Sequence, residues 1–301
     1  MTITVAYLGP EGTYSQLAAL AYSLDLEHRT GQSVELKAMP SIPTAMQATA
    51  TGATQLTIVP VENSTEGGVT TTLDMLWQLQ RLTIRHAMVM PIHHGLLSQA
   101  GDLTTVKVVY SHPQALSQCQ QWLECHLPQA ELVATRSTTE ALDHLADNKT
   151  VAAIASEWAA QLYSLPILAH NINDHSDNCT KFWVLKGHTA EESSKAGQYT
   201  SLAFSLPVNG PGALLKALAV FGHYGINLSR IESRPTKRSL GEYLFFVDLE
   251  TNGHSPTGQQ AIEDLLGCTE SLVNFGTYDL MTIDPSLAAA KAKTGVTQAL
   301  P

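Results

Sequence analysis

Short apolar runs alternate with helical patterns along the first 160 residues, and this alternation limits the possible folds more than any other feature of the chain. The runs, rich in Val and Ile as buried strands are, occupy residues 3–8, 56–61, 106–110 and 151–155. Each is followed by a short polar loop and then by a helical pattern. This order predicts an α/β fold with mainly parallel strands, in which ligands bind at the loops that follow the strands.

The first of these loops has the sequence GPEGTYS at residues 9–15, ahead of a helix expected over 17–26. Thr13 and Gln16 fit a capping box, which indicates a helix start. A helix start presents backbone N–H groups that can bind an anion, with an ordinary strand-to-helix turn as the alternative. The loop matches neither the dinucleotide fingerprint nor the P-loop, so no nucleotide site is expected.

A polar, turn-rich segment at residues 188–199 separates this region from a second pattern, and we expect it to be a linker. Beyond it, strands are predicted at residues 201–206, 227–234, 243–249 and 275–283, with helices at 212–224 and 259–266. This βαββαβ order is typical of ferredoxin-like domains. Residues 284–301 are Ala-rich without an apolar period, which predicts a flexible tail.

Composition excludes several classes of function. Lys and Arg total 17 against 27 Asp and Glu, for a net charge of −10, and without a basic cluster the chain is not expected to bind nucleic acid or an anionic membrane. The N-terminus lacks the pattern of a signal peptide. Prolines interrupt the longest uncharged run, so it is not expected to form a membrane-spanning helix. The cysteines (Cys119, Cys125, Cys179 and Cys268) form no C-x-x-C pair, which is typical of free thiols in the cytoplasm.

Metal chemistry is not predicted either. The 12 histidines show no ligand spacing such as H-E-x-x-H. Asp174, His175 and Asp177 could hold a cation, but an Asn/Asp-rich turn is the better explanation for them. Hydroxyl and amide side chains near strand ends remain, and they suit a small polar ligand: Thr13, Ser15, Asn63, Ser64, Ser111, Gln114, Ser137, Thr138 and Thr180.

Many of these residues lie in motifs that resemble those of the prephenate dehydratase family, in the same order. The motifs are YLGPEGTYS at 7–15, VPVENSTEG at 59–67, SHPQAL at 111–116, AAIAS at 152–156 and NCTKF at 178–182. The second pattern resembles an ACT domain of the phenylalanine-binding kind through GAL at 212–214, INL at 226–228 and IESRP at 231–235. The resemblance covers about residues 3–283.

The resemblance implies a fold class: a two-lobed α/β catalytic region similar to type II periplasmic binding proteins, followed by a βαββαβ ACT domain. The catalytic domain would be residues 1–187, with lobe one at 3–80 and 178–187 and lobe two at 81–177. The linker would be 188–199 and the ACT domain 200–283. No chorismate mutase domain is expected ahead of the catalytic motifs.

The family converts prephenate into phenylpyruvate, water and carbon dioxide without a metal or an organic cofactor, in phenylalanine biosynthesis. The departing ring hydroxyl needs a proton or hydrogen-bond donor, and the pyruvyl carboxylate needs a cation or convergent N–H groups. By motif position, Thr180 is the expected donor and Phe182 packs beneath it. Lys181 replaces the arginine common in the family, which keeps the charge but loses the two-pronged grip on a carboxylate. We expect Lys181 to hold the substrate carboxylate.

The matching motifs also imply the substrate contacts Thr13, Asn63, Ser64, Ser111 and Gln114. Glu62 and Glu66 would repel a dianionic substrate, so we expect them to support the fold. In the ACT domain, the resemblance implies an L-phenylalanine site between two paired domains, formed by Asn209, Gly212, Ala213, Leu214, Glu232, Ser233 and Arg234. Feedback inhibition would follow, unless the domain only dimerises.

The sequence therefore predicts a cytoplasmic homodimer or homotetramer with prephenate as substrate and L-phenylalanine as effector. Two other functions stay open. An arogenate dehydratase would run the same chemistry on a substrate with an amino group in place of the keto oxygen. A non-catalytic amino-acid sensor would keep the fold with a degenerate site.

Overall fold

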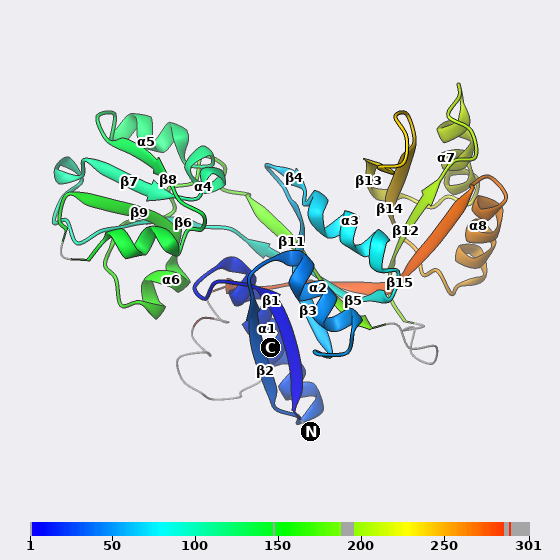
Figure 1. Ribbon diagram of the computed structural model, residues 1–301, viewed down its shortest axis with the longest axis horizontal. Coiled ribbons are helices and arrows are strands. Elements are labelled where there is room, and N and C mark those ends of the chain that lie inside the picture. The colour runs from blue at the N-terminus through cyan, green and yellow to red at the C-terminus, as the bar shows by residue number, and fades with distance from the viewer. Residues whose placement is uncertain (1, 147, 188–195, 286–288, 290–301) are drawn as a thin grey trace.

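The computed structural model describes residues 2–146, 148–187, 196–285 and 289. Residues 188–195 of the predicted linker and most of the predicted tail lie outside the described residues. Two α/β lobes and a βαββαβ domain lie in a row, with lobe one in the middle (Figure 1). This arrangement confirms the fold class expected from the sequence.

Lobe one is built on the parallel strands β1 (Ile3–Leu8), β2 (Val34–Met39) and β3 (Leu56–Asn63), with β1 in the middle. The helices α1 (Tyr14–Thr30), α2 (Ile42–Ala50) and α3 (Thr70–Leu79) belong to this lobe. Thr13 caps α1 by accepting from the backbone N–H of Gln16, as the capping box predicts. Strand β4 (Gly67–Gly68) pairs with the end of β3.

Two long antiparallel strands complete the sheet of lobe one. They are β5 (Leu82–Pro91) and β11 (Cys179–Gly187), and β11 lies between β3 and β5. Because β5 pairs into this sheet, lobe one extends to about residue 91, past the boundary expected at residue 80. The chain leaves lobe one after β5 and returns just before β11. These two connections are joined by a hydrogen bond of 2.9 Å from the Ile92 amide to the Asn178 carbonyl. β11 is therefore the strand on which the chain returns to lobe one, and it begins directly after the connection from lobe two.

Lobe two holds a five-stranded sheet in the order β10-β6-β9-β7-β8. Its strands are β6 (His94–Leu97), β7 (Val108–Ser111), β8 (Glu131–Ala134), β9 (Val151–Ser156) and β10 (Ile167–Ala169). Its helices are α4 (Pro113–Ser117), α5 (Gln120–His126) and α6 (Glu157–Leu162), with short 3₁₀ turns at Leu103–Thr105 and Glu140–His144. Every residue of β9 is buried, which explains its continuous run of small and apolar side chains.

The last domain has the predicted βαββαβ order. Its elements are β12 (Tyr199–Ser205), α7 (Ala213–His223), β13 (Leu228–Pro235), β14 (Tyr243–Leu249), α8 (Pro256–Leu266) and β15 (Ser271–Thr282). Both helices pack on one face of the sheet, where Leu202, Phe204, Phe221, Val247 and Leu265 form the core. None of the described helices is long and apolar enough to cross a membrane.

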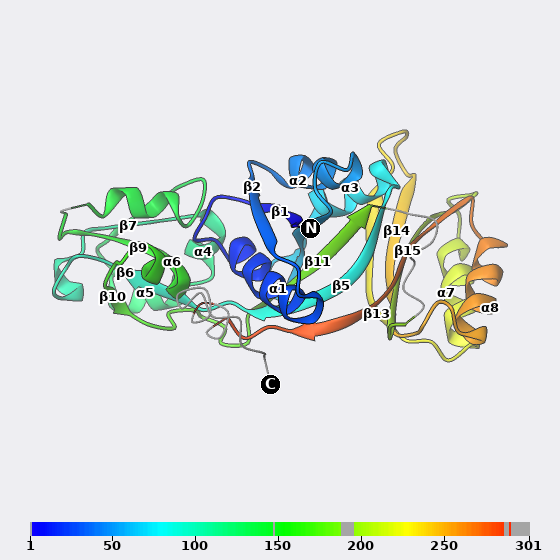
Figure 2. The same cartoon turned by 90° about the horizontal axis from the view of Figure 1, so that it is seen from below.

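Strand β15 joins the last domain to lobe one. Its first part pairs with β12, whereas Asp279–Thr282 pairs in parallel with His86–Val89 of β5. Gly276 lies near the change of partner with a φ of 112°, and a Cβ there would come within 3.2 Å of the Ile84 carbonyl oxygen. One continuous sheet therefore runs from the βαββαβ domain into lobe one (Figure 2).

Candidate active site

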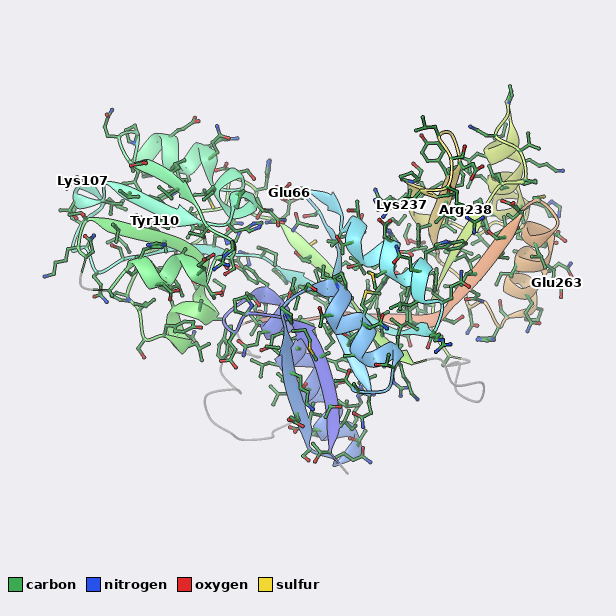
Figure 3. The ribbon with its side chains drawn as sticks, in the orientation of Figure 1. Glu66, Lys107, Tyr110, Lys237, Arg238 and Glu263 are labelled. Carbon is green, nitrogen blue, oxygen red and sulfur yellow. The ribbon has the colours of Figure 1, made fainter. Side chains whose placement is uncertain are left out.

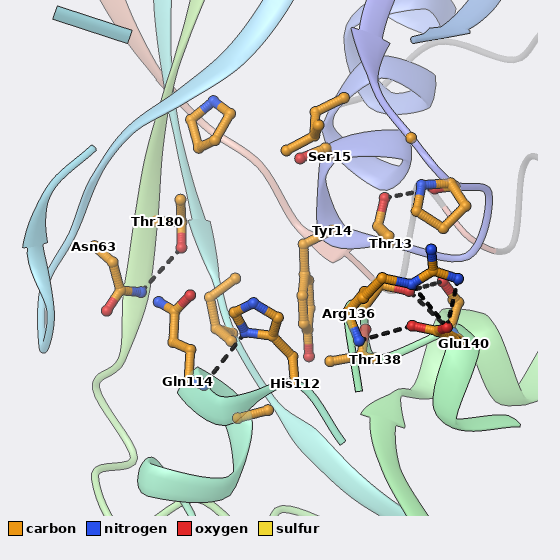
Figure 4. A pocket seen from close by; sticks show the side chains of 18 of the residues that line it. Thr13, Tyr14, Ser15, Asn63, His112, Gln114, Arg136, Thr138, Glu140 and Thr180 are labelled. Carbon is orange, nitrogen blue, oxygen red and sulfur yellow. Dashed lines mark hydrogen bonds and ion pairs between the residues drawn. The ribbon is translucent and has the colours of Figure 1, made fainter. Parts of the chain in front are cut away.

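A pocket of about 840 Å³ lies between the two lobes. Lobe one lines it with the start of α1 and with Thr180 and Phe182 of β11, and lobe two lines it with α4, which follows β7, and with the segment after β8. Thr180 and Gln114 lie on one side of the pocket, and Thr13 and Arg136 on the other (Figure 4). The volume and the mixed polar and apolar lining suit a small polar molecule.

The hydroxyl of Thr180 is oriented by Asn63. The Asn63 side-chain nitrogen Nδ2 lies 3.0 Å from Thr180 Oγ1. Asn63 Oδ1 accepts from the backbone N–H groups of Thr65 and Glu66, which can only donate, so the orientation of the amide is settled. The Thr180 oxygen therefore accepts from Asn63, and its own proton is left for an acceptor in the pocket.

A chain of amides connects Asn63 to lobe two. Asn63 Nδ2 also donates to Asn178 Oδ1 at 2.9 Å, and Asn178 Nδ2 donates to Gln118 Oε1 at 3.0 Å. The same Gln118 oxygen lies 3.0 Å from His94 Nε2. A carbonyl oxygen only accepts, so His94 carries its proton on Nε2. Residues of both lobes thus hold Thr180 in place through one network.

His94 is a buried member of that network and lines the pocket. Burial lowers the pKa of His94 to about 4, against the usual value near 6.5, so the imidazole is neutral at pH 7. Its Nδ1 atom is buried without a hydrogen-bond partner among the described residues. A protonated imidazole would bury a second N–H there, also without an acceptor, which is the physical reason why the neutral form is favoured.

Lys181 does not reach the pocket. Side chains alternate along a strand, so Lys181 points to the face of β11 opposite Thr180 and Phe182. Its ammonium donates to Asp248 Oδ2 of β14 at 2.7 Å, and its side chain is 15% exposed. The role expected from the motif, holding the substrate carboxylate, does not fit this position.

The predicted substrate contacts divide into two groups. Thr13, Asn63 and Gln114 line the pocket. Ser111 is fully buried and donates to the Ile154 carbonyl oxygen at 2.7 Å, so its hydroxyl ties β7 to β9. Ser64 accepts from the Cys179 amide at 3.0 Å and steadies the turn before Thr180. Ser64 and Ser111 do not line the pocket; their hydrogen bonds stabilise the backbone next to it.

Arg136 is the cation that the sequence analysis did not select. It lines the pocket from the loop after β8, and its guanidinium pairs with Glu140 at 2.7 Å. The Arg136 side chain is 92% exposed, so this ion pair is weak and the side chain is free to turn toward an anionic ligand. Its signal in the sequence is its place beside Ser137 and Thr138 in a polar loop that follows a strand.

The acidic residues that the sequence analysis discussed as substrate-repelling or cation-binding lie outside the pocket lining. Glu66 accepts from the Ser117 hydroxyl at 3.3 Å, and Glu62 lies opposite Lys181 in the pairing of β3 with β11. Asp174 accepts from the backbone N–H groups of Gln121 and Trp122 and so caps α5. Within the described ranges, no group of three or more His, Cys, Asp or Glu side chains is arranged to hold a metal ion.

The residues predicted for the effector site are spread over two faces of the βαββαβ domain. Asn209 lines a second pocket of about 530 Å³, together with residues of the 236–245 hairpin. Gly212, Ala213 and Leu214 begin α7 and are not part of that lining. Ser233 is exposed on the outer face of β13.

Glu232 and Arg234 point the other way, toward lobe one. Arg234 grips Asp74 of α3 with two hydrogen bonds, of 3.1 and 3.3 Å. Lys237, labelled in Figure 3, reaches the same carboxylate at 2.6 Å. The carboxylate of Glu232 fills the space where a side chain on Gly68 would lie. The inner face of β13 therefore docks on the catalytic lobe.

Two family models match the chain, one after the other. A family model described as prephenate dehydratase matches residues 5–190, and one described as ACT domain matches residues 200–267. The chain is 36% identical to the prephenate dehydratase of Lactococcus lactis subsp. lactis over 283 residues, 93% of this chain and 98% of that protein. It is 38% identical to the bifunctional chorismate mutase/prephenate dehydratase of Aquifex aeolicus, over 92% of this chain and 73% of that one.

Among solved structures, the chain is similar to the prephenate dehydratase of Arthrobacter aurescens in complex with L-Phe. The TM-score is 0.80, the sequences are 31% identical, and the match covers 97% of both chains.

Proposed function

The chain belongs to the prephenate dehydratase family, and from this premise we propose how its pocket carries out the decarboxylating dehydration of prephenate to phenylpyruvate. The proposal rests on one observation above all: Asn63 donates to the Thr180 oxygen and leaves the Thr180 proton for the pocket. That arrangement supplies the hydrogen-bond donor that a departing hydroxyl needs.

The reaction breaks two bonds between the ring and its substituents and makes the ring aromatic. The bond between the ring and its carboxylate breaks, its electron pair enters the ring, and carbon dioxide leaves. The C–O bond on the opposite side of the ring breaks at the same time, and the oxygen departs with a proton as water. Thr180 hydrogen-bonds to this oxygen while negative charge develops on it, and solvent water supplies the proton, because a threonine hydroxyl is a weak acid.

The pyruvyl carboxylate keeps its charge throughout and can be held firmly. Arg136 offers a planar pair of donors, and the first turn of α1 offers N–H groups that have no partner within the helix. The ring carboxylate loses its charge in the transition state, so tight binding there would slow the reaction. The pyruvyl end of prephenate therefore lies toward Thr13 and Arg136, and the ring hydroxyl lies toward Thr180.

L-phenylalanine regulates this activity at the ACT domain. Support comes from the ACT family model and from the relative that was solved in complex with L-Phe. Catalysis is assigned to residues 1–187, the linker to 188–199 and regulation to 200–283. The prephenate dehydratase model ends at residue 190 and the ACT model begins at residue 200, which supports this division.

The assembly is a cytoplasmic homodimer or homotetramer. Large apolar side chains are exposed on the ACT domain, where pairing would cover them: Val208, Leu215, Ile231, Leu240 and Tyr243. All four cysteines are free thiols, which fits a reducing compartment.

A turnover assay with two substrates tests the proposal. The purified chain is incubated with prephenate or with arogenate, and phenylpyruvate and phenylalanine are measured as the respective products. We expect kcat/KM to be higher for prephenate. A higher kcat/KM for arogenate would reassign the substrate, and a folded chain that turns over neither would favour the amino-acid sensor.

A further inference from the structure

Strand β11 separates the pocket from the ACT domain. Thr180 and Phe182 line the pocket on one face. On the other face, Trp183 belongs to a hydrophobic cluster that includes Phe246 of β14 and Tyr278 of β15, and Lys181 reaches Asp248. The residue that carries the chemistry is thus the direct neighbour of a residue held by the regulatory domain.

Asp248 is fully buried and saturated with donors. It accepts from Lys181 Nζ at 2.7 Å, from Arg230 at 2.9 and 3.1 Å, and from the Ser201 hydroxyl at 2.6 Å. Burial alone would raise the pKa of Asp248, but the Arg230 guanidinium and the Lys181 ammonium outweigh it and hold the pKa below its usual range. The carboxylate therefore stays charged, and it anchors Lys181 without exposure to solvent.

Arg230 extends the anchor to the next residue of the same face. Its guanidinium carbon lies 5.2 Å from the centre of the Trp183 ring, in a cation–π contact. Arg230 comes from β13, and Asp248 from β14. Two strands of the ACT domain therefore grip two alternate residues of β11.

The pairing of β11 with β3 is irregular next to Lys181, the residue that Asp248 holds. Thr180 pairs with Asn63 and Lys181 with Glu62, but the register with β3 shifts between Lys181 and Phe182. A bulge bends a strand locally, so the regular ladder is interrupted within two residues of Thr180 and does less to fix the exact direction of its side chain. A buried ion pair on the adjacent residue does limit it.

We propose that Asp248 is a positioning residue for the reaction. Through Lys181 it holds β11 so that Thr180 Oγ1 stays within hydrogen-bond distance of Asn63 and its proton points into the pocket. This inference rests on the proposed function of Thr180. It also gives a reason for a lysine at position 181: a single ammonium suffices for an anchor, whereas a carboxylate clamp gains from a guanidinium.

The test compares Asp248→Asn, Lys181→Met and the double variant in steady-state turnover of prephenate. Each single variant should lower kcat about tenfold or more while KM stays within about threefold, because positioning acts on the transition state more than on binding. The double variant should be no slower than the slower single variant, since both changes break the same interaction. Lys181→Arg keeps the charge and should retain kcat within about threefold.

Matched controls are Glu250→Gln and Lys216→Met, which remove an exposed charge from the same domain and should change kcat by less than about twofold. Circular dichroism and thermal unfolding establish which variants are folded, and Lys181→Met decides the matter if Asp248→Asn does not fold.

Folded variants with kcat within about twofold of the wild type would overturn the positioning role, and so would a rise of KM alone, since that result would mean that Lys181 binds the substrate. A wild-type chain without any turnover would overturn the proposed function as well, so the two failures are distinguishable.

Discussion

Asn63 Nδ2 donates to Thr180 Oγ1 at 3.0 Å, across the pair of residues that ends the β3–β11 ladder. Because the Asn63 oxygen is committed to backbone N–H groups, the direction of this bond is settled by geometry. The hydroxyl of Thr180 thereby becomes a donor to the pocket. Donation from Thr180 to the departing hydroxyl depends on this direction.

Asn63→Asp should reverse that direction with little change of shape. A carboxylate accepts where the amide donated, so Thr180 would turn its proton toward the new carboxylate and away from the substrate. We expect kcat for prephenate to fall about a hundredfold, with a smaller change in KM, in steady-state assays. Unchanged kcat in a folded variant would contradict the assigned direction.

His94 predicts a pH dependence of stability. Its pKa is lowered to about 4 in the folded chain, so between about pH 6.5 and pH 4 the unfolded state binds the proton more readily. Stability is then full above pH 6.5 and falls as the pH drops toward 4, by about 3 kcal/mol from this residue, at about 1.4 kcal/mol for each pKa unit.

Urea unfolding at pH 7 and pH 4.5 measures this effect, with His94→Gln as the variant that keeps a side-chain N–H donor. The variant should lose clearly less stability over this range than the wild type. His86, whose pKa burial also lowers to about 4, remains in both proteins and cancels in the comparison. An equal loss in both proteins would contradict the buried, neutral state of His94.

Arg136→Met should weaken substrate binding and leave the chemistry largely intact. The pyruvyl carboxylate keeps its charge through the reaction, so we expect KM to rise about tenfold while kcat changes by less than about threefold. Glu140→Gln releases Arg136 from its ion pair and should not raise KM. Lys107→Met, at the outer end of lobe two in Figure 3, is the control for removal of a cation far from the pocket. An unchanged KM in Arg136→Met would mean that the carboxylate binds elsewhere.

Asp74→Asn should weaken inhibition by L-phenylalanine. Asp74 receives both Arg234 and Lys237, and so links α3 of lobe one to the end of β13. Loss of this link should raise the concentration for half-inhibition about fivefold or more, within the usual range of allosteric coupling. Turnover without effector should stay within about twofold. Identical inhibition curves for variant and wild type would show that the signal does not pass through Asp74.

Much of the fold could be predicted because each element carries its own local signal. The order of strands and helices in the βαββαβ domain follows the sequence pattern, and β14 has the predicted bounds. β15 begins at Ser271, four residues before the predicted start at 275, because it pairs with β12 over its first part. Its second pairing, with β5, joins residues nearly two hundred positions apart, and no local pattern indicates such a contact.

The sequence motifs predicted which residues lie near the site, but they did not predict the direction in which each side chain points. Motif matches selected Thr180 and Asn63, and these two residues do form a contact. The same matches selected Lys181, although strand alternation alone places it on the face opposite Thr180. Its partner Asp248 lies 67 residues further along the chain, so the sequence could not say what that face meets. Ser111 likewise matches a motif, but its hydroxyl donates a hydrogen bond to the Ile154 carbonyl oxygen.

The role of Thr180 is tested by kcat for prephenate in Thr180→Ala, with Thr180→Ser as the matched control. Alanine removes the hydroxyl that Asn63 orients, and we expect kcat to fall about a thousandfold, while serine keeps the hydroxyl and should retain at least about a tenth of the wild-type rate. Near-normal turnover by folded Thr180→Ala would contradict the assignment of Thr180 as the donor to the departing hydroxyl.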